Sequence, residues 1–107
     1  MSFRPPAFLL TSSSGATLTP LDLELAGEKA DALARAGRRA EEALAKLLAA
    51  RSQEGADLDP LIDAAADAVF ALMIQRELCG LRNQADMVRR YGVTSDVMAR
   101  VGITRKR

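Results

Sequence analysis

From Thr19 to Ser52 the sequence contains no residue that must end a helix, so any fold of this chain has to include one long helix. Thr19 suits the N-cap position, and Pro20 suits the first helical position, where its missing N–H costs nothing. Asp22 and Glu24 complement the positive end of the helix dipole. At 1.5 Å per residue, a helix of about 30 residues is roughly 45 Å long. We therefore predict a first helix from Pro20 to about Ser52.

Apolar and small residues recur along this predicted helix at alternating spacings of three and four, the heptad pattern of helices that pack side by side. The seam consists of Leu23, Ala26, Ala30, Leu33, Gly37, Ala40, Leu44 and Leu47. Gly27 and Gly37 lie inside the helix, where each glycine costs about 1 kcal/mol relative to alanine. We interpret both glycines as positions where another helix approaches closely.

A second helix follows a short connection at 52–58, with Asp59 as the predicted N-cap and Pro60 as the first helical residue. Every position of Ala64–Ile74 except Asp67 is apolar. A surface helix normally carries its apolar residues as a stripe on one side. This segment therefore needs more than one neighbour to cover it.

Turn residues divide the rest of the chain. Gly80 and Asn83 predict a kink or a break in the second helix, and Tyr91-Gly92 predicts its end. Thr94 or Ser95 can cap a last short helix at 96–101, followed by a frayed tail.

Two long helices joined by a short loop form an antiparallel hairpin with one face of each helix in water. Because Ala64–Ile74 is apolar all round, we expect a second copy of the chain to cover it, and two-fold dimers are the commonest closed assembly. The predicted fold is all-α: a long antiparallel helical hairpin plus a short C-terminal helix, assembling into a coiled-coil-like homodimeric four-helix-type bundle. The predicted oligomer interface consists of Val69, Phe70, Leu72, Met73 and Ile74.

The start of the chain differs from the remainder. Pro5-Pro6 disfavours helix and Ser12–Gly15 is typical of a flexible turn, so we predict a flexible arm at 1–18 and a single helical domain at 19–107. Alternatively, this arm itself covers the apolar second helix, and Phe8-Leu9-Leu10 docks on its own or a neighbouring subunit.

Composition limits the possible functions. Alanine and leucine supply 35 of the 52 hydrophobic residues, which favours helix over sheet. The chain has no His and one Cys, so it lacks the commonest metal ligand and general base and cannot close an internal disulfide. Its apolar runs are too short for a bilayer span, and its first residues make a poor signal peptide. We expect a cytoplasmic protein that does not enter the membrane.

Two groups of residues could carry chemistry. Asp59, Asp63 and Asp67 share one helix face and could hold Mg²⁺ or Ca²⁺, but acids at the start of a helix are favoured by the dipole alone. Cys79 lies mid-helix with no base to lower its pKa, and we expect it to pack in the core. Arg76 and Glu77 beside it are expected to bridge subunits or face solvent. We predict no catalytic residue, no cofactor and no metal.

Charge is unevenly distributed. Residues 82–107 hold seven basic and two acidic residues, a net charge of +5, whereas residues 1–81 carry −4. A basic region attracts DNA, an acidic protein or the acidic half of its own chain.

The stretch Gln84–Val101 resembles a helix-turn-helix unit, with a turn at Gly92-Val93. In that family the second helix enters the major groove. The resemblance implies DNA contacts by Arg89, Arg90, Thr94, Ser95 and Arg100. Asp96 departs from the pattern because it repels phosphate. In the alternative interpretation the short helix folds back and covers the open end of the bundle with Val93, Val97, Met98, Val101 and Ile103.

Taken whole, 70–107 resembles short bacterial proteins grouped as a domain of unknown function, most clearly at Gln75-Arg76-Glu77 and Tyr91-Gly92-Val93. That resemblance implies no activity or ligand. From the sequence we expect a self-associating interaction or scaffold protein, and the alternative is a small DNA-binding regulator that uses 84–107.

Overall fold

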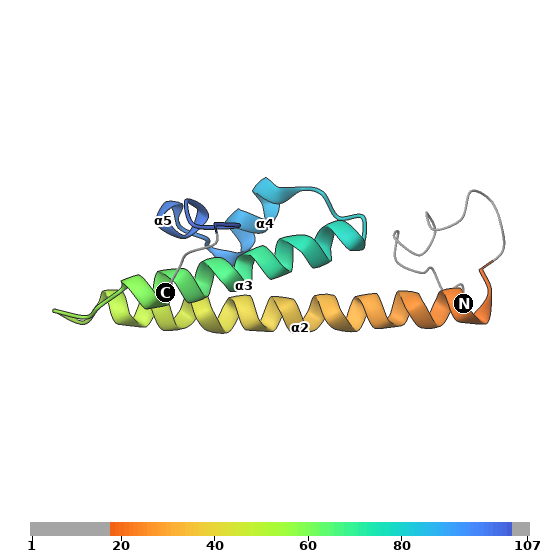
Figure 1. The fold of residues 1–107 in the computed structure, drawn as a ribbon, viewed down its shortest axis with the longest axis horizontal. Helices are drawn as coiled ribbons and strands as arrows, with labels where there is room; N and C mark the ends of the chain where they lie inside the picture. The colour runs from red at the N-terminus through yellow and green to blue at the C-terminus, as the bar shows by residue number, and fades with distance from the viewer. Residues whose placement is uncertain (1–17, 104–107) are drawn as a thin grey trace.

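The computed structural model describes residues 18–103, and this part of the chain contains helices joined by turns and loops, without strands. Four helices follow one another: α2 at Pro20–Arg51, α3 at Asp59–Leu78, α4 at Gln84–Tyr91 and α5 at Ser95–Met98 (Figure 1). The predicted all-α fold with a long helical hairpin is confirmed. The predicted arm lies outside the described residues, apart from Leu18, and so does the tail beyond Ile103.

The start of α2 follows its sequence signals. The Thr19 hydroxyl accepts a hydrogen bond from the Asp22 N–H at 3.1 Å, and the Asp22 carboxylate accepts one from the Thr19 N–H at 3.0 Å. This reciprocal pair is a capping box, and Pro20 stands at the first helical position. The helix ends at Arg51, one residue before the predicted end.

The start of α3 differs from the prediction by one residue. Leu58 is the N-cap and Asp59 is already helical, so the predicted capping role of Asp59 is wrong. No side chain caps this helix start, and the Asp57 carboxylate accepts a hydrogen bond from the Asp59 N–H at 3.2 Å. The Asp59 carboxylate is then available for a contact with Arg100, at 2.7 Å.

The predicted break in the second helix is confirmed. Helix α3 ends at Leu78, and Gly80 has a φ of +78°, a backbone conformation that favours glycine. Asn83 then caps α4, because its side-chain oxygen accepts from the Asp86 N–H at 3.0 Å. Gly92 ends α4 in the left-handed conformation. Helix α5 is shorter than predicted, since it ends at Met98.

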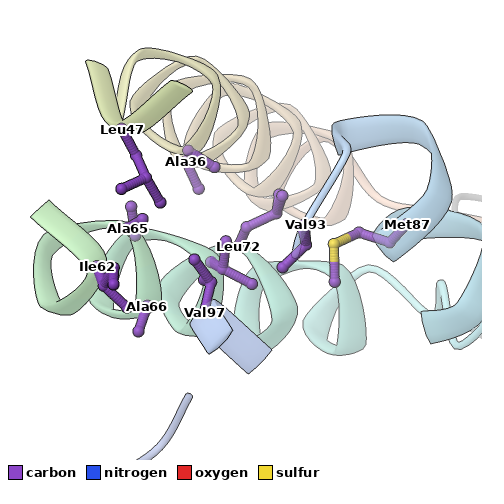
Figure 2. Close-up of a cluster of buried hydrophobic side chains, with 12 residues drawn as sticks. Ala36, Leu47, Ile62, Ala65, Ala66, Leu72, Met87, Val93 and Val97 are labelled. Carbon is purple, nitrogen blue, oxygen red and sulfur yellow. The ribbon is translucent and has the colours of Figure 1, made fainter. Parts of the chain in front are cut away.

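The core lies where α2, α3 and the C-terminal segment meet. Figure 2 shows Ala36 and Leu47 of α2 on one side of α3, and Val93 and Val97 on another side, near Leu72. The fully buried large side chains are Leu47, Leu72, Met87, Val69, Val97 and Cys79.

The C-terminal segment folds back on the hairpin, as one of the two interpretations of 84–107 predicted. Val93 and Val97 are buried, and Met98 and Val101 pack against the same core. Ile103 is the exception, because it is 56% exposed. The chain therefore covers part of its own apolar α3.

Helix α2 extends beyond its partner. The Sγ of Cys79 lies 3.8 Å from the backbone oxygen of Lys29, which marks where the end of α3 meets α2. Residues 20–28 of α2 project past that point (Figure 1). The fold is correspondingly elongated, with a radius of gyration of 17.0 Å, against about 13 Å for a compact chain of this size.

Candidate functional site

A cleft of about 590 Å³ lies between the C-terminal half of α2 and the turn that joins α4 to α5. Its lining consists of Glu41, Leu44, Ala45, Leu47, Leu48, Arg51, Arg76, Arg90, Tyr91, Gly92 and Thr94. The polar part of the lining consists of three guanidinium groups, two hydroxyls and one carboxylate, that of Glu41, and leucines supply most of the apolar part. An apolar wall with a few convergent polar groups is the usual make-up of a small-molecule site.

One end of the cleft is held together by a charged network. The guanidinium of Arg51 donates to both carboxylate oxygens of Asp96, at 3.0 and 2.8 Å, and to the Thr94 hydroxyl at 3.2 Å. Thr94 in turn donates to Asp96. The Thr94 hydrogen bond and then the Arg51 hydrogen bond lower the pKa of Asp96 to about 2. This network ties the C-terminal end of α2 to the start of α5.

Arg76 occupies a different position, in the last turn of α3. Its side chain is half-buried and borders the cleft and a second, smaller hollow near Met87. Its guanidinium donates to the backbone oxygen of Asn83 at 3.4 Å, and it forms no ion pair within residues 18–103. Arg76 was expected to bridge subunits or to face solvent; within this chain it is half-buried and contacts the residue that caps α4.

Arg90, the third arginine of the cleft, is more exposed. Its guanidinium lies 3.8 Å from the Asp86 carboxylate, a long contact between a base and an acid one helical turn apart. Arg89 shares the same carboxylate at 3.1 Å and does not line the cleft.

The acidic residues at the start of α3 hold the C-terminal segment. Arg100 contacts Asp59 at 2.7 Å and Asp63 at 2.9 Å, and it also donates to the Asp59 backbone oxygen. The hydrogen bonds with Asp59 and then Asp63 raise the pKa of Arg100. Within the described part of the chain, no group of three or more acidic or Cys side chains is placed to hold a metal ion. The acidic face considered as a metal site is thus partly occupied by an arginine.

The predicted DNA contacts have different surroundings, and two of them, Arg90 and Thr94, line the cleft. Arg100 is bound to Asp59 and Asp63, and Thr94 belongs to the network with Asp96. Arg89 and Arg90 are exposed on α4 and Ser95 is exposed at the start of α5. Helix α5, the segment compared with a recognition helix, has four residues and packs its Val97 into the core.

The predicted oligomer interface is divided by the fold. Val69 and Leu72 are buried inside the chain's own core rather than on its surface, and Met73 is half-buried against that core. Phe70 and Ile74 are each 42% exposed. The reason is intramolecular cover: α2 and the folded-back C-terminal segment pack on two sides of α3.

A groove of about 410 Å³ between α2 and α3 lies apart from the cleft. It is lined by Leu25, Glu28, Lys29, Asp31, Ala32, Arg35 and Gln75, with no residue of α4 or α5 among them. The same two helices carry further exposed apolar side chains near these positions in the sequence: Leu21 one turn before Leu25 on α2, and Ile74 and Leu78 one residue before and three residues after Gln75 on α3.

Sequence reasoning missed the cleft. Arg51 and Tyr91 lie at the ends of predicted helices and were not predicted as site residues. Other lining residues were assigned to separate features: Leu44 and Leu47 to the heptad seam, and Arg90 and Thr94 to the predicted DNA contacts. Residues of α2 and α4 that are 39 or more positions apart in the sequence meet there, because α4 folds back on α2.

Within 18–103, no helix is long and apolar enough to cross a membrane.

Comparison with known proteins gives a family and nothing finer. No curated protein and no solved structure matches the chain. A model described as a family of unknown function, DUF6665, matches residues 1–107. The resemblance to a domain of unknown function is therefore confirmed over the whole chain.

Proposed function

The chain belongs to the family of unknown function DUF6665, and we propose that this member is a self-associating helical interaction protein. The observation that carries the proposal is a set of exposed apolar side chains on α2 and α3, the two helices that form the groove. We call Leu21, Leu25, Ile74 and Leu78 the groove face; they are 62%, 48%, 42% and 56% exposed. Grouped exposed apolar side chains of this size mark interaction surfaces.

The charge pattern of α2 supports a second copy as the partner. Residues 20–31 hold four acidic side chains and one basic, whereas 32–51 hold five basic and two acidic. In an antiparallel arrangement of two α2 helices, the acidic half of one copy lies beside the basic half of the other. Complementary charges of this kind fix the orientation and register of an interface.

The geometry gives the second copy a role that the chain does not fill itself. Residues 20–28 extend past the end of α3, and no described residue of α4 or α5 covers the groove. A two-fold pairing of hairpins through this face produces the four-helix arrangement, because each α2 then has an α3 of its own and an α2 from the other copy. Of the residues predicted for the interface from the sequence, Ile74 keeps that role in this proposal, whereas Val69 and Leu72 do not.

The test is the molar mass in solution, measured by light scattering after size-exclusion chromatography at several concentrations. The wild type is expected at twice the mass of one chain. Leu25→Glu and Ile74→Glu are expected to elute as monomers with unchanged helical circular dichroism, because each places a charge in the apolar contact.

Leu23→Glu is the matched control. Leu23 is on the same helix and is 52% exposed, close to the 48% of Leu25. At 100° per residue, however, it lies on the opposite side of α2. It should remain dimeric. A monomeric wild type, or a dimer that survives both groove-face substitutions, contradicts the proposal.

The DNA-binding alternative receives less support. Arg100 forms ion pairs with Asp59 and Asp63, and the short α5 packs against α3. Adding a DNA duplex at low salt to the same light-scattering samples tests it directly. A complex that is lost in Arg89→Glu/Arg90→Glu and at high salt would favour a regulator over an interaction protein.

A further inference from the structure

We propose that the cleft between α2 and the α4–α5 turn binds a small organic anion, a carboxylate on an apolar body, with Arg76 as its charge partner. This inference is independent of self-association, since the cleft and the groove face share no residue. Three observations carry it: the pairing state of the arginines, the leucine wall and the size of the cleft.

The arginines of the cleft are not equivalent. Arg51 is neutralised by Asp96 at 2.8 Å, and Arg90 has the Asp86 carboxylate at 3.8 Å. Arg76 has no ion-pair partner among the described residues, although its side chain is half-buried. Burial of an arginine is unfavourable unless an anion accompanies it. Arg76 is therefore the one arginine of the cleft without an ion pair among the described residues, and its guanidinium suits the carboxylate of a monoanion.

Guanidinium and hydroxyl groups supply the donors that a carboxylate needs. Arg76 carries five N–H donors, and its one described acceptor is the Asn83 backbone oxygen at the long distance of 3.4 Å. A carboxylate can accept two parallel hydrogen bonds from such a group. Tyr91 and Arg90 line the same cleft and offer further donors. Glu41 is the single acid in the lining and disfavours ligands with more than one negative charge.

The opposite wall accounts for the apolar body of the ligand. Leu44, Leu47 and Leu48 come from α2, and Leu48 is 70% exposed. The space of about 590 Å³ falls within the roughly 300–1,000 Å³ of small-molecule sites. A ligand with an aliphatic chain covers these leucines while its head group reaches Arg76.

Binding can be followed with the protein's own fluorophore. Tyr91 is the one tyrosine of the chain, which has no tryptophan, and it lines the cleft. Titration with octanoate is expected to change tyrosine emission saturably, with a matching isotherm in calorimetry. Octanol keeps the aliphatic chain without the charge, and acetate keeps the charge without the chain. Both are expected to bind at least about tenfold more weakly than octanoate.

The variants separate the charge partner from general electrostatics. Arg76→Gln is expected to weaken octanoate binding by about tenfold or more and to leave octanol binding unchanged. Arg89→Gln is the matched control, since it removes the same charge from an exposed position outside the cleft; it should bind octanoate like the wild type. Leu48→Ser should weaken octanoate and octanol alike.

The proposal is overturned by any of three results: no saturable response to octanoate, equal affinity for octanoate and octanol, or equal affinity of Arg76→Gln and the wild type. Circular dichroism of Arg76→Gln checks that it is folded. Light scattering on the same samples reports the oligomeric state separately, so failure of self-association leaves this test intact.

Discussion

The hydroxyl oxygen of Tyr91 lies 2.9 Å from the position that a Cβ on Gly37 would occupy. This contact joins α4 to the middle of α2, and a glycine is what allows the ring to approach so closely. The sequence predicted close packing at both internal glycines of α2. It is confirmed at Gly37, where the neighbour is a side chain rather than a helix backbone. At Gly27, no packing neighbour among residues 18–103 lies within 4 Å of the corresponding position.

The two glycines should therefore respond oppositely to alanine. Gly27→Ala is expected to raise the free energy of unfolding by about 0.5–1 kcal/mol, because alanine is the better helix former and nothing opposes it. Gly37→Ala gains the same helix propensity but displaces the Tyr91 hydroxyl, so it should be neutral or destabilising. Urea denaturation followed by circular dichroism measures both.

A double-mutant cycle isolates the contact. Tyr91→Phe removes the hydroxyl that the new methyl group meets, so Gly37→Ala should be more favourable in that background by about 0.5 kcal/mol or more. Strictly additive effects would show that the hydroxyl does not limit residue 37.

Arg100 is expected to hold the C-terminal segment on the hairpin. Arg100→Gln should lower the urea midpoint, because it leaves Asp59 and Asp63 side by side without the base that bridges them. Arg89→Gln is the control, since its ion pair with Asp86 is between exposed neighbours on one helix. Equal midpoints for the two variants would contradict this role.

Stability should fall in acid partly through Asp96. Its pKa is about 2 in the folded chain, below the ordinary value of 3.8, mainly because Thr94 and Arg51 stabilise the carboxylate. A depressed folded-state pKa contributes stability that is present above the unfolded value and is lost as pH falls from about 4 toward 2. Asp96→Asn should therefore show a smaller loss of unfolding free energy over that interval than the wild type. Unfolding at a series of pH values measures the two slopes, and parallel slopes would refute the assignment.

Leu72 and Ile74 should behave as core and surface positions, although they are two residues apart. Leu72 is 1% exposed, so Leu72→Asp buries an unpaired charge and is expected to cost about 3 kcal/mol or more. Ile74→Asp, at a position 42% exposed, should leave the chain folded. Thermal unfolding by circular dichroism distinguishes them; a folded, fully stable Leu72→Asp variant would mean that this side of α3 is not in the core.

Local signals in the sequence were sufficient for the helices themselves. Thr19, Pro20 and Asp22 define the start of α2, and Gly80 and Gly92 mark the ends of α3 and α4, because capping and left-handed turns depend on a few adjacent residues. The one-residue error at Asp59 arose because α3 begins without a side-chain cap: Leu58 is the N-cap, and the Asp57 carboxylate accepts from the Asp59 N–H.

Which faces are covered was decided by the tertiary structure. The sequence showed an apolar α3 and a basic C-terminal region, but it could not pair Arg100 with Asp63, which is 37 positions away, or Arg51 with Asp96, 45 positions away. Those pairings depend on how α4 and α5 fold back, and they bring Val97 onto α3 where a second copy had been expected. Local hydrogen bonding thus determines the order and the limits of the helices. The cleft, the groove face and the burial of Leu72 depend on long-range packing, which the spacing of residues along the chain does not specify.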